Sequence, residues 1–194
     1  LGEIAEVSSG GSAPQGDKYF NGEHPFVRVQ HIEQFSDSIN RYDLITDEAV
    51  NKYKLKKYKS GTIVFPKSGA SIYLEKRAML PVDAYIVSHL CAVNSAQEDV
   101  DQEFLFYGLK QIPLSKEKAD GYPTLNLSEV KRVSIPLPSF LEQKKVVRVL
   151  SVIKKAIDQQ EKIIAKAKEL KRSLMHRLFT YGLRGEELKE TEIG

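Results

Sequence analysis

The longest regular pattern of apolar positions runs through the last quarter of the chain. Apolar residues recur there in alternating steps of four and three, which is the seam of a coiled-coil helix. The seam consists of Val146, Leu150, Ile153, Ile157, Gln160, Ile164, Ala167, Lys171, Leu174 and Leu178. Pro and Gly are absent between Pro138 and Gly182. The pattern therefore predicts one uninterrupted helix over residues 139–181, about 64 Å long at 1.5 Å per residue.

Both ends of this predicted helix carry boundary signals. Ser139 follows two closely spaced prolines and precedes Glu142 by three residues. This spacing predicts a capping box in which the Ser139 hydroxyl accepts from the Glu142 amide and the Glu142 carboxylate accepts from the Ser139 amide. Gly182 suits a left-handed C-cap. A helix of this length needs a packed face, so we expect its seam to meet a second long helix. The alternative is a helix that lies across its own domain, with the seam as ordinary core.

The preceding residues alternate short apolar runs with turns. We expect a helix or turn at 1–7, a loop at 8–22, helices at 46–52 (capped by Thr46), 102–112 and 127–132, and strands at 25–30, 61–65, 71–74, 77–80, 84–87 and 90–93. Short strands separated by Gly, Pro and charged turns favour a mainly antiparallel, partly curled sheet. The predicted fold class is α+β, with a globular domain at 1–138, the long coiled-coil-type helix at 139–181 and a tail or linker at 182–194.

Composition narrows the class of protein. The chain has 194 residues, 41% of them hydrophobic, which is enough for one domain core. A single cysteine, Cys91, excludes an internal disulfide and fits a reducing, cytoplasmic compartment. The sequence contains neither an apolar run of about 18 residues, as a membrane span requires, nor a visible signal peptide. Because the chain begins at Leu1 rather than Met, we expect further residues ahead of it.

Positive charge is concentrated on the predicted helix. Residues 139–181 hold eleven Lys or Arg and four Asp or Glu, a net charge of +7, whereas the whole chain carries +3. A basic helix beside a nearly neutral domain favours an anionic partner. The alternative is a solvated helix surface.

A second basic segment lies within the predicted domain. Five lysines fall within eight residues and interleave with Tyr53 and Tyr58. They are Lys52, Lys54, Lys56, Lys57 and Lys59. Lysine contacts phosphate as a flexible point charge, and tyrosine can donate a hydrogen bond to it. The segment therefore predicts contacts to a phosphate backbone, although a merely soluble surface would carry the same residues.

Three further positions extend the predicted binding surface. Turns at Lys67-Ser68-Gly69 and at Lys76-Arg77 add charge between strands. Arg28 and Gln30 lie together at the end of a predicted strand. Arg and Gln side chains pair with guanine and adenine edges in the major groove, so these two residues are candidate base readers.

The sequence offers little for catalysis. The four histidines (His24, His31, His89 and His176) lack metal-ligand spacing, and the apolar surroundings of His89 are typical of a hydrogen-bonded core residue. Nucleotide-binding and hydrolase motifs are absent. Glu75 and Asp83 lack the clustering that a metal-dependent nuclease needs. We predict no catalytic residue, no metal and no cofactor.

Four stretches of the chain resemble the specificity subunit of type I restriction–modification systems. They are Leu1–Glu6 with its Ser/Gly loop, Pro25–Val29, Gly61–Phe65 with Lys67-Ser68-Gly69, and Ile135–Pro138 through Glu142-Gln143. The proline pair followed by Glu-Gln at the start of a long basic helix is the most specific of these. The resemblance extends over essentially the whole chain.

The resemblance implies a role for each region. In such subunits a target-recognition domain precedes a spacer helix, and the unit usually occurs twice. The two helices pack antiparallel, and each domain reads half of a split DNA site. The resemblance thus implies double-stranded DNA, methyltransferase (modification) subunits and a restriction subunit as partners, with DNA contact at Lys67-Ser68-Gly69 and assembly through 139–181. It implies no catalysis by this chain, and base-reading residues that vary with the target.

This chain carries one such unit, which departs from the usual pattern. It predicts either a homodimer through the seam or a piece of a longer chain; Glu190–Gly194 resembles the lead-in to another recognition domain. Two other classes compete with this interpretation. A coiled-coil adaptor would bind only protein, and a small nuclease would need a carboxylate cluster.

Overall fold

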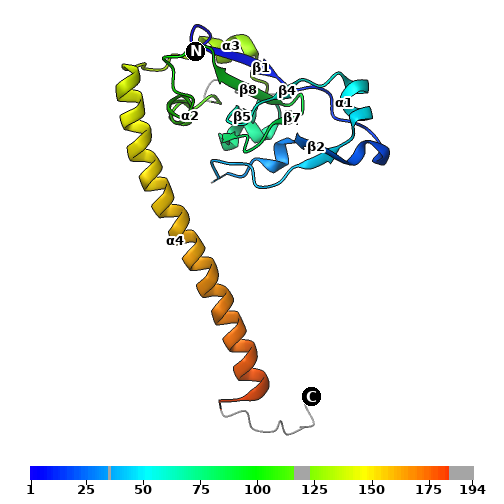
Figure 1. The fold of residues 1–194 in the computed structure, drawn as a ribbon, viewed down its shortest axis with the longest axis vertical. Coiled ribbons are helices and arrows are strands. Elements are labelled where there is room, and N and C mark those ends of the chain that lie inside the picture. The colour runs from blue at the N-terminus through cyan, green and yellow to red at the C-terminus, as the bar shows by residue number, and fades with distance from the viewer. Residues whose placement is uncertain (35, 116–122, 184–194) are drawn as a thin grey trace. The chain divides into compact units, whose positions relative to one another are not determined.

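The computed structural model of this chain describes residues 1–34, 36–115 and 123–183 (Figure 1). Its contacts divide the chain into two units, Leu1–Val146 and Val147–Gly194. The first unit contains the strands and the shorter helices, and the second continues the long helix. The predicted lead-in at Glu190–Gly194 and most of the predicted tail lie outside the described residues.

Two four-stranded sheets form the first unit. In the first sheet the order is β1 (Ala5–Ser9), β8 (Leu90–Ser95), β5 (Ile63–Pro66) and β6 (Ala78–Met79), and all neighbours are antiparallel. In the second the order is β3 (Asp43–Ile45), β2 (Phe20–Val27), β7 (Ala84–Ile86) and β4 (Lys57–Tyr58). Only the β2–β7 pair there is parallel. The predicted α+β class and antiparallel character are confirmed, but the strands form two sheets instead of one.

The inner strands β8 and β5 of the first sheet are buried on both faces, and the sequence of β8 shows why. Along β8, Leu90 and Ala92 join the core cluster that also holds the second sheet, whereas Cys91 and Val93 join the cluster under the helices. Successive strand residues point to opposite faces, so a strand buried on both sides needs an unbroken apolar run. The run Leu-Cys-Ala-Val meets this requirement.

Three short α-helices complete the first unit. They are α1 (Asp47–Tyr53), α2 (Gln102–Lys110) and α3 (Leu127–Arg132). Thr46 caps α1 as predicted, because its hydroxyl accepts from the Ala49 amide at 3.3 Å. The cluster under α2 and α3 includes Leu105, Phe106, Leu109 and Val130.

Several local predictions were wrong. The predicted strand at 71–74 is a 3-10 helix, η3 (Ala70–Leu74), which follows a turn at Gly69 and buries only Ile72. Residues 1–7, expected as a helix or turn, form a turn at residues 2–4 and then enter β1, because Ala5 and Val7 alternate inward against β8. The predicted loop at 8–22 contains a short 3-10 helix, η1 (Asp17–Tyr19), and the start of β2.

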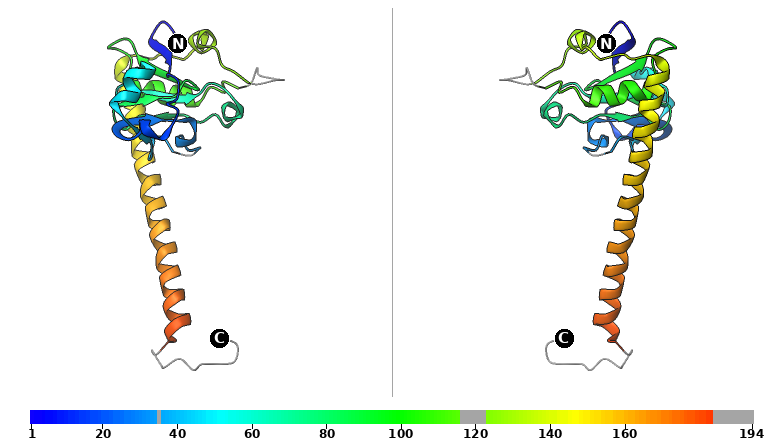
Figure 2. Two further views of the ribbon diagram at one scale, coloured as in Figure 1. Left: turned by 90° about the vertical axis from the view of Figure 1, so that its right-hand side faces the viewer. Right: turned by 90° about the vertical axis from the view of Figure 1, so that its left-hand side faces the viewer.

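The long helix α4 (Phe140–Tyr181) spans 42 residues. Figures 1 and 2 show it as one uninterrupted helix. Glu142 accepts from the Ser139 amide at 3.1 Å, as the capping box predicts, but the Ser139 hydroxyl donates to the same carboxylate at 2.6 Å instead of accepting from the backbone. Gly182 has φ +67° and donates to the Leu178 carbonyl at 2.9 Å, which confirms the left-handed C-cap. Within the described residues, no helix is long and apolar enough to span a membrane.

Candidate nucleic-acid interface

The parallel pair of β2 and β7 brings two loops to one edge of the second sheet. Phe26 pairs with Tyr85 and Val27 with Ile86, so both strands end at the same place. The Val87 amide donates to the Val27 carbonyl at 2.9 Å. The carboxyl ends of parallel strands commonly form binding crevices because their loops leave the sheet together. This edge carries Arg28–His31 after β2 and Val87–His89 after β7.

The basic segment reaches the same edge from β4. This strand runs antiparallel to β7, with Lys57 opposite Tyr85, so the residues before Lys57 lie at the carboxyl end of β7. Leu55 lies against Gly11, which bridges to Val87. Lys54 therefore lies at this edge with Arg28–His31, while Lys59 lies beyond the other end of β4.

The turn at Lys67-Ser68-Gly69 is held beside the loop after β7. The Lys67 amide donates to the His89 carbonyl at 2.9 Å, and the Lys67 carbonyl accepts from the Leu125 amide at 2.7 Å. Ser68 Oγ lies 2.5 Å from His89 Nδ1. Gly69 has φ +80°, a conformation that disfavours residues with a Cβ. Separate segments of the chain thus converge at one edge, which makes the turn a rigid part of the surface.

His89 was expected in the core, and that prediction was wrong. It lies exposed in the turn between β7 and β8 and contacts Ser68. The flanking apolar residues belong to the two buried strands, which is why the sequence around His89 resembles core. The polar pair Ser88-His89, which interrupts two strand-length apolar runs and contains a turn-favouring serine, is the signal that could have identified the turn.

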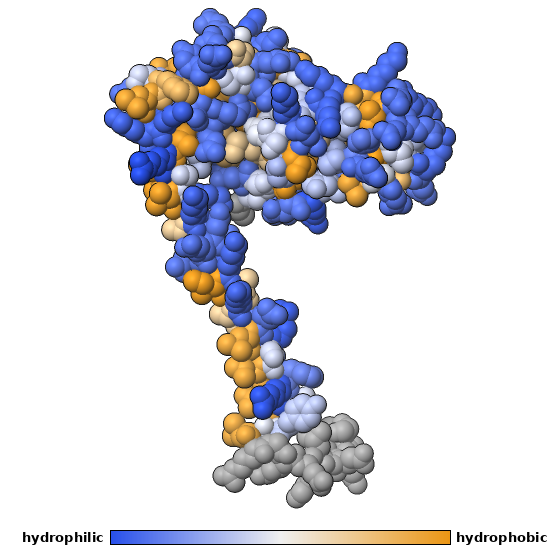
Figure 3. Space-filling view, in the orientation of Figure 1, coloured by the Kyte–Doolittle hydropathy of each residue, from blue (hydrophilic) through white to orange (hydrophobic). Residues whose placement is uncertain are grey.

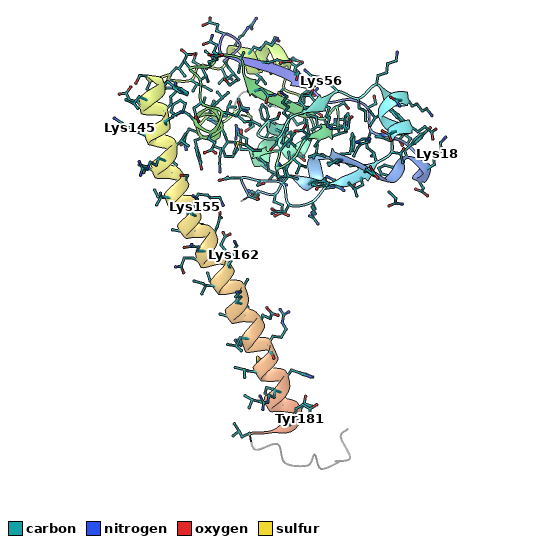
Figure 4. The ribbon with its side chains drawn as sticks, in the orientation of Figure 1. Lys18, Lys56, Lys145, Lys155, Lys162 and Tyr181 are labelled. Atoms are coloured by element: carbon teal, nitrogen blue, oxygen red, sulfur yellow. The ribbon has the colours of Figure 1, made fainter. Side chains whose placement is uncertain are left out.

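The predicted lysines differ in their surroundings. Lys52 Nζ donates to the Tyr19 hydroxyl at 2.6 Å, and this hydrogen bond lowers the pKa of Tyr19. Lys56 Nζ lies 2.8 Å from Glu6 Oε1 (Figure 4). Lys54, Lys57 and Lys59 are exposed. Lys54 ends α1 in the left-handed region at φ +49°.

Arg77 is not on the surface, which corrects its predicted role. Its guanidinium lies 2.7 Å from Glu75 Oε2 and donates to the Ile112 carbonyl at 2.6 Å. The residue is 4% exposed, and burial lowers the pKa of the guanidinium against the opposing charge of Glu75. Arg77 therefore tethers η3 to the end of α2 and cannot reach a phosphate in this structure. Its neighbour Lys76 is half-buried.

Arg28 and Gln30 were expected to lie in a strand at 25–30, and that prediction was wrong. β2 ends at Val27, and the chain turns into a 3-10 helix, η2 (Val29–His31). The Arg28 amide donates to His31 Nδ1 at 3.0 Å instead of pairing with a neighbouring strand. Arg28 Nε lies 2.7 Å from Asp43 Oδ2, whereas Gln30 is exposed.

The described residues include no group of three or more His, Cys, Asp or Glu that could hold a metal ion. Cys91 is buried in β8, and burial raises its pKa to about 12. A thiol with so high a pKa stays protonated at neutral pH and is a poor nucleophile.

In the second unit, the seam of α4 is uncovered. Ile153 is 53% exposed and Ile157 is 49% exposed, and Ile164, Leu174 and Leu178 are exposed to a similar degree. On the face drawn in Figure 3, hydrophobic side chains lie open along the described length of this helix. Lys155 and Lys162 are among its charged residues (Figure 4). An apolar stripe of this length normally packs against another helix.

Comparison with known proteins identifies the family. Residues 1–169 match the family model described as the type I restriction modification DNA specificity domain. The chain is 33% identical over 195 residues to the type I restriction enzyme MjaIX specificity subunit of Methanocaldococcus jannaschii, covering 97% of this chain and 44% of that protein. The chain thus spans about half the length of the curated relatives it matches.

Solved structures share the fold at lower identity. A chain from a study of assembly and conformational transition of the type I R-M system has a TM-score of 0.67 at 19% identity, covering 94% of this chain and 45% of that one. The HsdS subunit from Thermoanaerobacter tengcongensis has a TM-score of 0.60 at 17% identity, covering 94% of this chain and 44% of that one. By the extent of the family match, this chain belongs to the type I restriction modification DNA specificity domain family.

Proposed function

We propose that this chain is the non-catalytic DNA-recognition unit that reads one half of a split target in a type I restriction–modification system. The observation that carries the proposal is the family match over residues 1–169. The convergence of the loops after β2 and β7 with the turn at Lys67-Ser68-Gly69 supports it, because such an edge offers polar side chains to a ligand. Phosphate contacts position the protein on DNA, and base contacts select the sequence.

Within this surface the exposed lysines take the phosphate role. Lys54 and Lys57 carry exposed ammonium groups near this edge, and Lys67 approaches it from β5. Lys59 is also exposed, but it lies beyond the other end of β4 and would contact phosphate outside this edge. Lys52 and Lys56 are already hydrogen-bonded to Tyr19 and Glu6, so they contribute by charge from fixed positions. Ser68 and Gly69 shape the turn that carries Lys67.

The long helix takes the assembly role. It carries the net charge of +7 over residues 139–181. Its seam is exposed at Val146 and from Ile153 to Leu178, and half-buried at Leu150. We expect this seam to pair with a second such helix, either from another copy of the chain or from a second half of a longer specificity chain. Two recognition domains would then read an interrupted DNA target.

One antiparallel register suits two copies of this helix particularly well. It places Gln160 opposite Lys171 of the other copy, so that the two polar interruptions meet each other. Four further layers are then apolar; they pair Leu150 with Tyr181, Ile153 with Leu178, Ile157 with Leu174 and Ile164 with Ala167. Parallel pairing in register would instead place Lys171 opposite Lys171 of the other copy, and these two positive charges would repel each other.

Flanking charges favour the same register. Glu161 comes beside Lys168 of the other copy, and Ile163 comes beside Leu170. Oppositely charged flanking residues set partner choice and orientation in coiled coils. We therefore expect the antiparallel arrangement.

Partner subunits would supply the chemistry. We propose a modification (methyltransferase) subunit and a restriction subunit as partners, in the cytoplasm. The direct test is co-expression of this chain with a candidate modification subunit, followed by co-purification and methylation mapping of the host DNA. A single methylated motif should appear only when both proteins are present.

The control is the modification subunit expressed alone, which should leave that motif unmethylated. Co-purification without methylation would favour the protein-only adaptor. Mg²⁺-dependent cleavage of DNA by the purified chain would favour the nuclease. Absence of both co-purification and DNA binding would contradict the proposal.

A further inference from the structure

The turn after β2 is held by a compact arrangement of charged groups. Arg28 and His31 face the same carboxylate: Arg28 Nε lies 2.7 Å from Asp43 Oδ2, and His31 Nε2 lies 3.6 Å from Asp43 Oδ1. The Arg28 amide donates to His31 Nδ1 at 3.0 Å. Asp43 belongs to β3, which pairs with β2 opposite Phe26. One side chain from the edge strand thus fixes both ends of η2.

The hydrogen bond to Nδ1 also sets the proton position on His31. In a neutral imidazole one nitrogen accepts and the other carries the proton. Because Nδ1 accepts from a backbone amide, the proton lies on Nε2, which faces Asp43. His31 is 5% exposed, so water does not compete for the contacts that its imidazole makes in the turn.

The guanidinium of Arg28 takes part in three contacts in this arrangement. Besides the ion pair with Asp43, it lies over the Phe20 ring at 5.2 Å and near the Phe26 ring at 5.9 Å. Reaching a base would break the ion pair, leave a half-buried carboxylate without its partner and remove the stacking. Arg28 is therefore suited to hold the turn and not to read DNA.

Gln30 is left as the outward group of the turn. It is the middle residue of η2 and is exposed, whereas His31 beside it is buried. A carboxamide offers one donor and one acceptor side by side, which matches the N6 and N7 groups of adenine. A fixed backbone at both neighbours limits the positions that this carboxamide can take, which favours discrimination between bases.

We propose that Arg28, His31 and Asp43 are positioning residues that present Gln30 to an adenine of the half-site, so that Gln30, not Arg28, is the specificity-determining residue of this turn. The inference rests on the proposed DNA-recognition function. It names the residue, the base it takes and the groups that hold it in place.

The test uses the complex with the modification subunit. The probes are duplexes carrying the methylated motif from the mapping experiment and the same duplexes with one base pair changed at a time. Gln30→Ala should reduce discrimination at one A·T pair by roughly 5- to 150-fold. It should leave discrimination elsewhere, and affinity for unrelated DNA, unchanged. Gln34→Ala, at another exposed glutamine of the same segment, is the matched control and should change nothing.

Variants of the positioning residues distinguish a residue that contacts a base from one that only holds the turn in place. Arg28→Lys keeps the charge beside Asp43 and should retain discrimination at every base pair, whereas a guanine-reading arginine would lose it. Asp43→Asn should weaken discrimination at the same A·T pair as Gln30→Ala. Circular dichroism and co-purification check that each variant is folded and assembled.

Two results would overturn the inference. One is a Gln30→Ala complex with an unchanged preference at every position, and the other is an Arg28→Lys complex that loses preference at a G·C pair. If the wild-type complex shows no preference among the probes, the proposed recognition function fails as well. If the wild type discriminates and Gln30→Ala matches it, only the role of this turn is wrong.

Discussion

Charged residues that look alike in the sequence have different environments in the first unit. Lys54 and Lys57 are exposed, Lys56 is paired with Glu6, and Arg77 is buried against Glu75. Burial decides which of them can meet a phosphate, because a charge that is already compensated inside the protein costs free energy to expose. The lysines should therefore affect DNA binding, and the buried groups should affect folding.

Exposed lysines should contribute affinity without sequence preference. Changing Lys54, Lys56 and Lys57 to Ala should weaken binding to all duplexes alike, because phosphate contacts carry no sequence information. The log–log slope of affinity against salt should flatten by roughly one unit for each phosphate that the variant no longer neutralises. Binding titrations of the assembled complex at several salt concentrations measure both quantities. An unchanged slope and affinity would assign the segment to a solvated surface.

Arg77 should matter for folding instead. Arg77→Ala removes the ion-pair partner of Glu75, which keeps its hydrogen bond from the Ser115 amide, and the donor to the Ile112 carbonyl, so unfolding free energy should fall by roughly 1–3 kcal/mol. Urea denaturation followed by tyrosine fluorescence measures this. Lys76→Ala, the half-buried neighbour, is the control and should cost far less. A stable Arg77→Ala protein with weakened DNA affinity would return this residue to the interface.

His31 should make stability depend on pH. Burial lowers the pKa of His31, the charges of Arg28 and Arg41 act in the same direction, and Asp43 opposes them. The folded state then binds fewer protons than the unfolded state, in which the histidine pKa is about 6.5. Stability from this group is complete above about pH 6.5 and falls as the pH drops below it. Urea midpoints between pH 5 and 8 should therefore show a shallower slope for His31→Gln than for the wild type; equal slopes would refute the assignment.

At the scale of elements, the junction before α4 depends on one buried amide. Gln143 is 1% exposed. Its Oε1 accepts from the Asp101 amide at 2.9 Å, and its Nε2 donates to the Asp99 and Pro138 carbonyls at 3.0 and 2.9 Å. This side chain connects the first turn of α4 with the loop that begins α2. The Glu142-Gln143 pair therefore has two structural roles: Glu142 caps α4, and Gln143 binds the start of α4 to the loop before α2.

Removing this amide should destabilise the first unit. Gln143→Ala leaves three backbone groups without their partner, and each unsatisfied buried group costs about 1–3 kcal/mol. The urea midpoint should fall clearly. Gln159→Ala, at an exposed position of the same helix, should leave it within error. Equal midpoints for the two variants would contradict the docking role.

At the scale of the whole molecule, the open seam of α4 predicts self-association. Burying an Ile or Leu side chain is worth about 1.5–3 kcal/mol before association costs. The wild-type chain should therefore sediment as a dimer at tens of micromolar. Ile153→Asp with Ile157→Asp should give a folded monomer that binds a split target only weakly, while Gln159→Ala should remain dimeric. A wild-type chain that sediments as a monomer, or a mapped target that is continuous and unsymmetrical, would contradict this prediction.

Disulfide crosslinking between introduced cysteines can distinguish the two helix orientations. The native Cys91 should not interfere, because it is buried and its thiol is protonated. A mixture of Ile153→Cys and Leu178→Cys chains should crosslink in the antiparallel register proposed above. Each variant alone should not. Crosslinking of either variant with itself would indicate parallel helices.

The sequence alone determined the elements whose signals are local. Four features depend on residues close in the chain: the long helix, its ends at Ser139 and Gly182, the cap at Thr46 and the apolar run of β8. Each was found at or near its predicted place. Helix caps and periodicity act within a few residues, so a single chain suffices to recognise them.

The tertiary structure decided the features that join distant residues. Only the fold shows that the strands form two sheets, that β2 and β7 are parallel, and that their loops share an edge with Lys67-Ser68-Gly69. The same holds for the roles of Arg28, His89 and Arg77. Whether such a side chain is a reader, a tether or a buried partner depends on Asp43, Ser68 and Ile112. These residues lie up to 35 positions away in the sequence and meet it only through folding.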